Sequence, residues 1–561
     1  MSPVSSRSFT IACIPIEAYA IVIGTHPDPA ERFAAEELKR CLELATGFRP
    51  ALISDQTMHP YELVIGQTNR NNAALTALRQ SLGKEGYVLK QDDTRLFITG
   101  QTPRGTLYGV YDFLEKYVGL CFCSSSFEDV LSTEVSDIPT GLLKTFVPRL
   151  HFRDIYWFDA FHPAFSARMK CNSGIKRDLS AYGGGVEYAG IFVHTLPHLA
   201  GTSTEPNDQP CLTDEAVYQK VLSNVRQWLA DNPHASIISV SQNDSFADGR
   251  GCQCPRCRAL DEAEGTPMGS LLTFVNRIAD DIREEYPQVM VDTLAYRYTR
   301  TPPRHIVPRN NVIVRLCSIE CCFSHPFTEC DESGFVADVK AWSKICRNLH
   351  IWDYTTNFQF YLCPFPNLHL LYDNVRFLTE HHMVGYFAEG NFQSPSGEFG
   401  ELRCYLLGKL MWDPDMSRED YESHMNRFLK AYYGEGWHFI REYIDLSSAR
   451  AATAHLGIYD SVAKTFGMSE PPSDEDIRFL EDMRALWDKA LALADDLHRP
   501  HVERSSLQIR YAQLYACWNE NTSPAEMEDI YALTRKHGIT YFSEGRPFPE
   551  LTHFDTPIEK W

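Results

Sequence analysis

The chain has 561 residues, of which 44% are hydrophobic and 12% aromatic, with a formal net charge of −21 and a pI near 5.4. This length predicts about three domains, and the apolar content excludes a wholly disordered chain. The acidic balance argues against nucleic acid as a partner, because phosphate binding needs a basic surface. The sequence has no apolar run long enough to span a bilayer, so we expect no membrane partner.

The N-terminal segment and the cysteines bear on the compartment. Met1–Thr10 lacks the continuous apolar core of a signal peptide. The 17 cysteines are scattered as single residues or close groups, without the pattern of a small disulfide framework. We therefore expect a cytoplasmic protein with reduced thiols, although a mature chain whose signal had been removed would look similar.

Residues 1–147 are predicted to form a small α/β domain. Apolar, β-branched runs alternate with segments that carry apolar residues at helical spacing, and the later strands pair across a turn. This order is typical of a small α/β unit. The predicted strands are 19–24, 61–66, 86–90 and 95–100, and the predicted helices are 30–46 and 104–115.

Residues 148–414 change to repeated strand-then-helix units, which predict a (β/α)₈ TIM barrel. Ser236–Asp244 is the central strand, an apolar run of the kind buried on both faces of a parallel sheet, and it ends in an amide and a carboxylate. Eight units across about 260 residues match the size of such a barrel, whose reactive groups sit where the strands end. The predicted strand ends are 153–157, 169–172, 190–194, 236–244, 289–298, 312–320, 349–354 and 385–389.

Residues 415–561 are predicted to form a C-terminal helical domain. Three segments, 421–433, 474–498 and 502–518, carry apolar residues at helical spacing.

Several stretches, taken together, resemble known families. Ala35–Leu38 with Thr46–Gly47, and Thr106–Glu115, resemble the accessory domain that precedes the barrel in α-glucuronidases and β-hexosaminidases. A second set resembles the proteins grouped as domain of unknown function 4838, which overlaps glycoside hydrolase family 163. This set comprises Ser239–Asp244 with its following Cys-x-Cys-x-x-Cys, Thr293–Tyr296, Tyr386–Asn391 and Leu410–Pro414. The resemblance covers nearly the whole chain in order. It implies a hexosaminidase-like N-terminal domain, a catalytic barrel, a helical tail and retaining cleavage of β-linked N-acetylglucosamine.

Three residues are the candidates for catalysis. Glycoside cleavage generally needs an acid to protonate the leaving oxygen and a second group to stabilise the anomeric centre. The layout resembles that of substrate-assisted β-hexosaminidases, which have an adjacent Asp-Glu pair after the fourth strand, but this chain departs from the pair and has Asn243 and Asp244 there. We assign Asp244 as the leading acid, Asn243 as a hydrogen-bonding positioner and Glu389 as the second carboxylate. Gly390 is expected to let the substrate approach closely.

Other strand ends are expected to line the same face and bind the substrate. Aromatic side chains there suit stacking on a sugar, and polar side chains suit hydrogen bonding to it. For each residue the alternative is a structural role in a salt bridge, a loop anchor or the core. The expected substrate-binding residues are Asn172, His194, Tyr296, Glu320, Trp352, Asp353 and Tyr354.

Cys252, Cys254 and Cys257 are spaced as Cys-x-Cys-x-x-Cys, at which thiolates can share a tetrahedral ion. Zinc usually takes four ligands, so a fourth would have to come from another loop. The alternatives to a structural zinc are reduced packing cysteines or a disulfide, and catalysis itself is expected to need no cofactor. The candidate fourth ligands are Cys211, Cys321, Cys322 and Cys330.

The leading functional hypothesis is a retaining, substrate-assisted glycoside hydrolase that cleaves β-linked N-acetylglucosamine in oligosaccharides or glycans. The first alternative is another exo-glycosidase, such as an α-glucuronidase-like enzyme, for which Arg153, Arg297 and Arg315 could hold a carboxylate. The second is a non-catalytic carbohydrate-binding barrel, since fold does not fix function. The partner is a carbohydrate in each case, and the sequence leaves the oligomeric state open.

Overall fold

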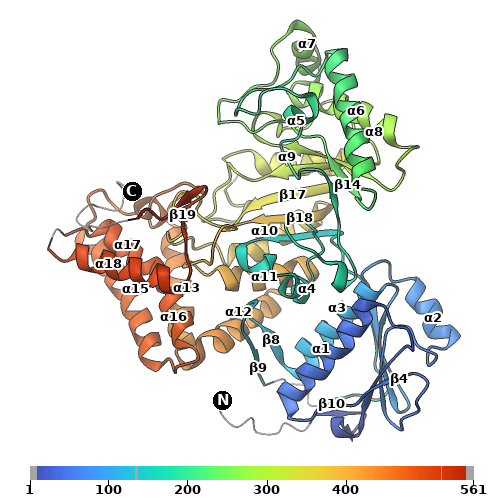
Figure 1. Cartoon of the computed structure of the whole chain (residues 1–561). Helices are drawn as coiled ribbons and strands as arrows, with labels where there is room; N and C mark the ends of the chain where they lie inside the picture. The colour runs from blue at the N-terminus through green and yellow to red at the C-terminus, as the bar shows by residue number, and fades with distance from the viewer. Residues whose placement is uncertain (1–8, 133–136, 331, 520, 551–561) are drawn as a thin grey trace.

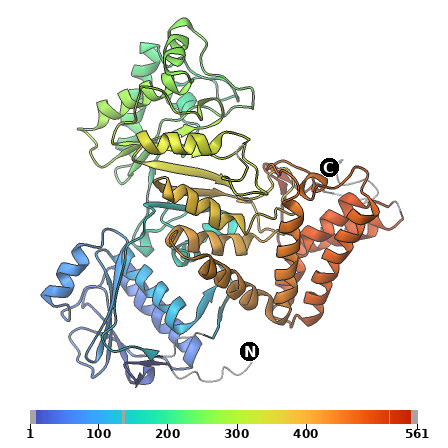
Figure 2. The ribbon, with the colours of Figure 1, turned by 180° about the vertical axis from the view of Figure 1, so that it is seen from behind.

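The computed structural model describes residues 9–132, 137–330, 332–519 and 521–550. Figure 1 shows three parts: an N-terminal α/β unit, a central curled sheet with its helices, and a C-terminal group of helices. Figure 2 shows the three parts from behind, with the central part next to both of the others. In the part of the chain that is described, no helix combines the length and the apolar character needed to cross a membrane.

The N-terminal unit is built on a six-stranded mixed sheet, as the sequence predicted. The strands 20–23, 52–54, 62–65 and 95–100 pair parallel to one another, and the strand 87–92 pairs antiparallel with 95–100 on one side and with 143–146 on the other. In spatial order the strands are β11 (Leu143–Phe146), β6 (Tyr87–Asp92), β7 (Arg95–Gly100), β5 (Glu62–Ile65), β3 (Ala20–Ile23) and β4 (Leu52–Ser54). The helices are α1 (Pro29–Thr46), α2 (Ala73–Gln80) and α3 (Pro103–Phe113). Short strands complete the unit: β1 (Thr10–Ile11), β2 (Ile14–Pro15), β8 (Leu120–Phe122), β9 (Glu128–Val130) and β10 (Asp137–Ile138).

Both faces of this sheet are covered by helices. Side chains alternate between the two faces of a strand, so Leu63 and Ile65 of β5 join the large core with α1 and α3, whereas Val64 packs with Leu75 of α2. Helix α1 begins at its Asp28 cap, whose carboxylate accepts a hydrogen bond from the backbone of the first turn. A sheet that buries both faces explains why its strands are continuous apolar runs.

Buried ion pairs join this unit to the central sheet. Arg153 Nη2 lies 2.7 Å from Glu85 Oε2, and Lys170 Nζ lies 2.8 Å from Glu115 Oε2. Both cationic side chains are almost completely buried. Removing one partner of a buried pair typically costs about 3–5 kcal/mol, because the other charge is left uncompensated. These pairs therefore fix the orientation in which the two parts dock.

The central sheet has seven strands, and all of them run parallel. Their order is β12-β18-β17-β16-β15-β14-β13, so the first and last strands in the chain are neighbours, as in a barrel. The strands are β12 (Phe152–Tyr156), β13 (Tyr188–Ala189), β14 (Ile237–Ser239), β15 (Met290–Ala295), β16 (Val312–Cys317), β17 (Leu349–Tyr354) and β18 (Met383–Glu389). The helices are α4 (Pro163–Arg168), α5 (Leu196–Ala200), α6 (Glu215–Asp231), α7 (Pro255–Glu264), α8 (Met268–Ile282), α9 (Phe335–Ile345), α10 (Leu370–Glu380) and α11 (Gly400–Trp412).

The barrel-like fold is confirmed, but its second strand is reduced to a bridge. The predicted strand 169–172 is replaced by an isolated parallel bridge between Ser173 and Val186. The backbone N–H of Asn172 donates to the carbonyl of Arg153, and the N–H of Val186 donates to the carbonyl of Asn172. These bonds connect β12 to the segment that precedes β13, in the position that a complete second strand would occupy. The predicted third strand, 190–194, also differs, since β13 ends at Ala189, and the predicted strand 236–244 is shorter, since β14 ends at Ser239.

The C-terminal part is helical, as predicted, and the wholly buried helix α11 separates it from the sheet. Helices α12 and α15 each begin with a capping box, formed by Ser417 with Asp420 and by Ser473 with Asp476. The helices are α12 (Arg418–Tyr433), α13 (Trp437–Ala451), α14 (Val462–Thr465), α15 (Asp474–Leu493), α16 (Arg499–Ser505), α17 (Leu507–Ala516) and α18 (Ser523–Lys536).

A hairpin near the end of the chain returns to the carboxyl end of the sheet. It consists of β19 (Tyr541–Ser543) and β20 (Arg546–Pro547). The backbone N–H of Tyr361, in the loop after β17, donates to the carbonyl of Phe542, and the N–H of Glu544 donates to the carbonyl of Phe358. Figure 1 shows β19 between the C-terminal helices and the central sheet.

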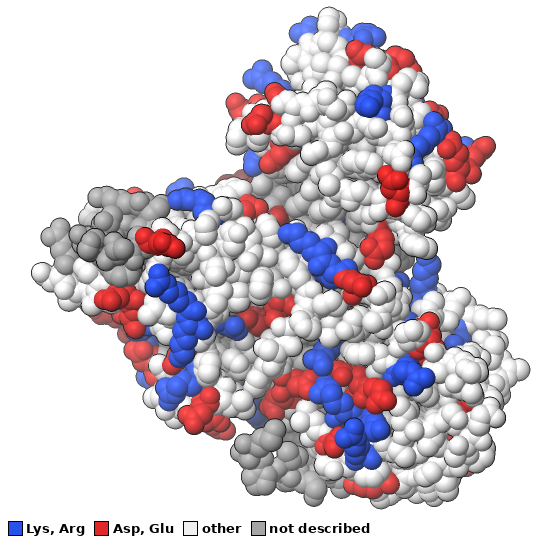
Figure 3. Space-filling view, in the orientation of Figure 1, with Lys and Arg blue, Asp and Glu red and all other residues white. Residues whose placement is uncertain are grey.

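The surface carries charges of both signs. In Figure 3, basic and acidic side chains are interspersed in small groups on the visible face. The same view shows a notch between the lobe that contains α5–α8 and the lobe of C-terminal helices.

Candidate active site

The carboxyl ends of β12, β17 and β18 place three side chains at one level. Tyr156 and Tyr354 are the cross-strand partners of Glu389 in the two parallel ladders. Trp352 lies on the same face as Tyr354 because side chains alternate along a strand, and their rings stack with centroids 6.3 Å apart. Glu389 is therefore surrounded by an aromatic wall.

Glu389 is the buried carboxyl group of this cluster. Its side chain is 8% exposed and accepts a hydrogen bond of 2.9 Å from Trp352 Nε1. Burial raises the pKa of Glu389 to about 8, and the negative charges of Glu544 and Asp244 act in the same direction. The Trp352 hydrogen bond and the Lys176 ammonium oppose this rise in pKa. The group therefore retains a proton at neutral pH, which is the state that a general acid needs.

Hydrogen bonds from Thr355 fix the position of the Glu389 backbone. Thr355 donates two hydrogen bonds to the Glu389 carbonyl, from its backbone N–H at 2.8 Å and from its hydroxyl at 2.7 Å. Trp157 Nε1 donates in turn to the Thr355 hydroxyl. A Cβ at position 390 would lie 1.8 Å from the Trp157 ring. Gly390 thus makes room for Trp157, which corrects the expectation that this glycine serves the approach of a substrate.

Asp244 lies at the same end of the sheet but is open to solvent. Its side chain is 52% exposed, and its Oδ1 accepts a 3.2 Å hydrogen bond from the Tyr296 hydroxyl. Arg297 Nε donates to the same hydroxyl at 3.0 Å, and His194 Nε2 lies 3.9 Å from Asp244 Oδ1. Burial, and secondarily the Asp244 charge, raise the pKa of Tyr296, so the phenol remains a neutral donor. Tyr296, His194 and Asp244 are therefore brought together as the sequence predicted.

Three residues at this rim have left-handed backbone conformations. Their φ angles are +57° for Lys176, +56° for His194 and +51° for Arg297. Such angles are uncommon outside glycine and cost about 1–3 kcal/mol each unless the surroundings hold them. The Lys176 ammonium lies over the rings of Tyr156 and Phe392, at 5.0 and 4.5 Å from the centroids. Seven other non-glycine residues of the described chain also have positive φ, so these angles do not by themselves mark the rim as a functional site.

The C-terminal part adds two residues that the sequence analysis missed. Tyr459 lies between α13 and α14, and Glu544 lies in the β19–β20 turn. Burial and the Asp244 charge raise the pKa of Glu544. Burial raises the pKa of Tyr459 to about 12, with smaller effects from Glu544, Glu389 and Asp244. Neither residue follows a barrel strand, so the strand-end pattern contained no signal for them.

Two of the predicted amides serve other contacts. Asn243 donates from Nδ2 to the carbonyls of Glu205 and Asp208, at 2.7 and 3.1 Å, and so anchors the loop before α6. Asn172 donates from Nδ2 to Glu85 Oε1 at 2.9 Å, in the interface with the N-terminal unit. These contacts direct the two amide groups to loop and interface partners, and neither is directed to the carboxyl group of Glu389 or of Asp244.

Two of the predicted carboxylates also have structural partners. Asp353 is buried and accepts hydrogen bonds from the Ser318 hydroxyl at 2.6 Å and from the Tyr386 hydroxyl at 2.5 Å. It lies on the opposite face of β17 from the aromatic wall, because side chains alternate. Glu320 pairs with Arg300 at 3.0 Å, outside the Glu389 cluster.

Only one of the three arginines considered for binding a substrate carboxylate lies at this rim. Arg153 is paired with Glu85 in the domain interface. Arg315 is fully buried and pairs with Asp292 at 2.6 Å. Arg297 contacts the Tyr296 hydroxyl beside Asp244 and is the arginine that could reach a ligand there.

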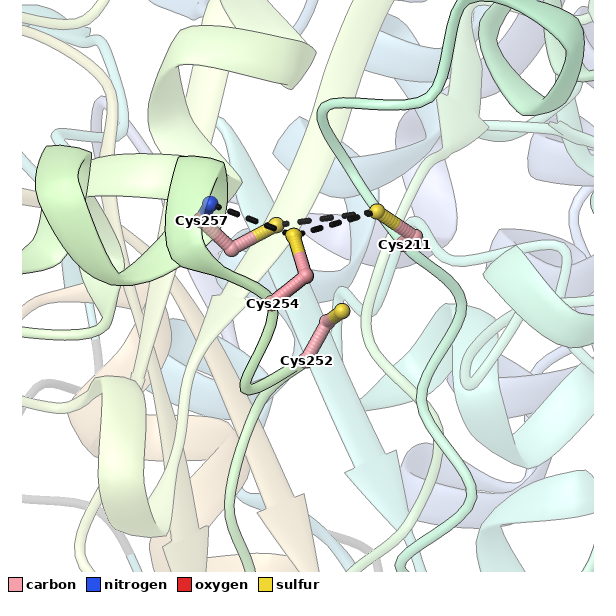
Figure 4. Close-up of side chains that lie close together, drawn as sticks. All are labelled: Cys211, Cys252, Cys254 and Cys257. Carbon is pink, nitrogen blue, oxygen red and sulfur yellow. Dashed lines mark hydrogen bonds between the residues drawn. The ribbon is translucent and has the colours of Figure 1, made fainter.

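Four cysteine side chains converge near the start of α7, as Figure 4 shows, with Cys211 coming from the loop before α6. Cys211 joins the three cysteines of the sequence motif, and the four sulfur atoms all lie within 4.8 Å of one another. Its Sγ is 3.7 Å from that of Cys254 and 3.8 Å from that of Cys257. Zinc–sulfur bonds of about 2.3 Å in a tetrahedron place sulfur atoms about 3.8 Å apart. The donor set and these spacings fit a structural zinc ion. The four residues are Cys211, Cys252, Cys254 and Cys257.

Replacing Trp352 by Phe tests the environment of Glu389 directly. The indole hydrogen bond favours the charged carboxylate, so its loss should raise the pKa of Glu389 above its wild-type value. A phenyl ring retains packing against Phe192, whose centroid is 5.5 Å from that of Trp352. The pKa is measured from the carboxylic C=O infrared band that disappears in Glu389→Gln. A lower pKa in Trp352→Phe would contradict the assigned hydrogen bond.

Comparison with known families identifies the chain. The family described as "Domain of unknown function (DUF4838)" matches residues 122–445, which is more than half of the chain. "Glycosyl hydrolase family 67 N-terminus" matches residues 15–113. The chain therefore belongs to the DUF4838 family, and the family resemblance expected from the sequence is confirmed. Among curated proteins, none matches the chain.

Solved structures are similar to the chain at low sequence identity. A family GH115 4-O-methyl-α-glucuronidase with specificity for decorated arabinogalactans is 12% identical with a TM-score of 0.58, over 92% of this chain and 76% of the other. The GH20 β-N-acetylhexosaminidase from Streptomyces coelicolor A3(2) is 13% identical with a TM-score of 0.44, over 77% of this chain and 94% of the other. The GH115 similarity establishes a glycoside hydrolase-like fold.

Proposed function

We propose that this chain is a glycoside hydrolase in which Glu389 is the general acid and Asp244 the second carboxylate. The observation that carries the proposal is the contrast between the two groups at the same end of the sheet. Glu389 is buried and protonated near neutral pH, whereas Asp244 is half-exposed and held by Tyr296. Two carboxyl groups in unlike environments are the usual means of dividing acid and base work in glycosidases. This contrast supports Glu389, rather than Asp244 as first expected from the sequence, as the general acid.

The proposed reaction follows the substrate-assisted course. The Glu389 proton passes to the glycosidic oxygen as the bond from that oxygen to the anomeric carbon breaks. The carbonyl oxygen of the substrate's own acetamido group forms the new bond to the anomeric carbon, while Asp244 accepts a hydrogen bond from the amide N–H. The Glu389 carboxylate then takes a proton from water, whose oxygen opens the intermediate with net retention.

The proposed substrate is a β-linked N-acetylhexosamine, with N-acetylglucosamine as the leading choice. The wall of Trp352, Tyr354 and Tyr156 offers apolar ring faces, which suit the apolar face of a sugar and an acetamido methyl group. The Trp352 indole N–H also donates a hydrogen bond to Glu389, the proposed general acid.

A uronic acid substrate is the second candidate. Arg297 and Lys176 place two cationic side chains at the rim, and both could bind a sugar carboxylate. The chain's α-glucuronidase-like N-terminal match and GH115-like fold are compatible with this alternative, although they concern fold alone.

A panel of nitrophenyl glycosides tests the proposal. We expect release of nitrophenol from the β-N-acetylglucosaminide, and no comparable release from the α-glucuronide. The reverse preference, together with a large loss in Arg297→Ala, would establish the uronate alternative. Sugar binding without release from any glycoside would contradict an enzymatic role and favour a carbohydrate-binding barrel.

We also propose that the four-cysteine cluster holds a structural zinc ion and that catalysis needs no cofactor. The sulfur spacings support the first point. The described cysteines are all free thiols, which supports a reducing, cytoplasmic location.

A further inference from the structure

A second group of sulfur and imidazole side chains lies where the loop after β16 meets the loop after α13. Its four ligand atoms all lie within 4.8 Å of one another. Cys322 Sγ is 3.3 Å from His325 Nδ1, and Cys330 Sγ is 3.2 Å from His455 Nδ1. The first three residues lie in the loop between β16 and α9, and His455 lies between α13 and α14. Side chains 125 residues apart are thus brought to one point.

The outer nitrogen of each imidazole has an oxygen partner. His325 Nε2 lies 3.0 Å from the carbonyl oxygen of Ala452, and His455 Nε2 lies 3.6 Å from Glu332 Oε1. The Ala452 contact favours a proton on Nε2 of His325, which leaves its Nδ1 lone pair directed at the cluster, and Glu332 places a negative charge near Nε2 of His455. Histidine ligands of zinc are commonly oriented by such an oxygen acceptor on the other nitrogen.

The two loops are connected independently of these four side chains. The backbone N–H of Phe323 donates to the carbonyl of Leu456 at 2.7 Å, and the Ser324 hydroxyl donates to the carbonyl of Ala454. The two loops are therefore held together by hydrogen bonds that do not involve the four ligand side chains. A prearranged set of two sulfurs and two imidazole nitrogens matches the tetrahedral donor sets of structural zinc sites.

We propose that Cys322, His325, Cys330 and His455 bind a zinc ion, at a site separate from the four-cysteine cluster. The ion would be held by two thiolates and two neutral imidazoles, so binding releases the two thiol protons. It would connect the loop after β16 to the loop after α13.

This connection reaches the candidate active site. Tyr459 lies four residues after His455. Two hydrogen bonds connect the same loop to the segment after β17: Phe358 N–H donates to the Ile458 carbonyl, and Asn357 Nδ2 donates to the Asp460 carbonyl. The ion would thus hold Tyr459 beside Glu389, a consequence that rests on the proposed function. The metal site itself does not depend on that function.

Metal analysis of the full chain, purified under reducing conditions, tests the proposal. We expect about two zinc ions per wild-type chain, one for each tetrahedral donor set. His455→Ala should lose one of them, and because this side chain is 58% exposed the substitution leaves the core intact. Cys254→Ser should lose the other, and serine retains the helix cap that Cys254 provides to α7. Cys13→Ser, at an exposed cysteine outside both clusters, should retain both ions.

The zinc count separates the two sites. A count in His455→Ala equal to that of wild type would overturn the proposal, whatever the four-cysteine cluster binds. A metal-free wild type with a disulfide between Cys322 and Cys330 would overturn it as well. Cobalt substitution gives a second readout, because the visible spectrum of a two-sulfur, two-nitrogen site differs from that of a four-sulfur site. In Cys254→Ser, cobalt should report the former spectrum.

Glycoside hydrolysis is measured separately. Loss of one zinc in His455→Ala with a several-fold fall in kcat supports both the site and its effect on Tyr459. Loss of the zinc with unchanged kcat keeps the metal site and overturns the link to Tyr459. An inactive wild type that still binds zinc would contradict the proposed function alone.

Discussion

Glu389→Gln is expected to lower the turnover of a glycoside with a poor leaving group by about 10²–10⁴-fold, the usual contribution of an acid–base group. Glutamine keeps the size of the side chain and can still meet Trp352 Nε1, but its amide cannot deliver a proton to the glycosidic oxygen. An activated nitrophenyl leaving group needs less protonation and should lose much less rate in the glycosylation step. Measuring kcat/KM for a matched pair of glycosides checks this selectivity.

The pH profile gives a second readout of the same group. The wild-type kcat/KM should fall as the pH rises through about 8, because the free enzyme then loses the Glu389 proton. Glu389→Gln should remove this alkaline limb. A profile unchanged in the variant would contradict the assignment of Glu389 as the acid.

Stability is the control for this variant. The pKa of Glu389 is raised from 4.5 to about 8 in the fold, so between these values the folded chain retains a proton that the unfolded chain has lost. The free energy of unfolding therefore falls as the pH rises across this window. Glu389→Gln removes that penalty and should be at least as heat-stable as wild type at pH 8. If Glu389→Gln were less heat-stable than wild type, unfolding would explain its loss of activity and the variant would not test the acid.

The fold was predictable where its pattern is local and repeated. Apolar runs followed by segments with apolar residues at helical spacing identified the parallel strands and the helices. The second strand was not predictable as a strand, because a single bridge between Ser173 and Val186 replaces it. The β19–β20 hairpin has little pattern of its own and depends on its bonds to Phe358 and Tyr361.

The candidate site was predictable in position but not in the environment of each group. Parallel strands bring their carboxyl ends together, so Asp244 and Glu389 could be paired from the sequence. The raised pKa of Glu389 could not be predicted, because burial, the charge of Glu544 from a distant part of the chain and the hydrogen bond from Trp352 all act on it. Asp353 is a different case, because the alternation of side chains along β17 already places it on the other face from Trp352 and Tyr354, where Ser318 donates a hydrogen bond to it.

Asp244→Asn is expected to slow glycosides with poor and with activated leaving groups to a similar extent, by about 10²–10⁴-fold for a group that acts on the reacting centre. Asparagine keeps the hydrogen bond to the Tyr296 hydroxyl but lacks the charge that would orient and polarise the acetamide. Because this role does not involve the leaving group, the ratio of the two rates should stay close to that of wild type.

Asn243→Ala serves as the neighbouring comparison for Asp244→Asn. Its amide anchors the 205–208 loop, so we expect a fall in heat stability and equal, smaller losses of rate on both glycosides. Asp244→Asn should instead keep its heat stability, since the carboxylate is half-exposed. If Asp244→Asn spared the activated glycoside selectively while Glu389→Gln slowed both alike, the two roles would be reversed. Asp244 would then be the acid, as first expected from the sequence, and Glu389 the group that acts on the acetamide.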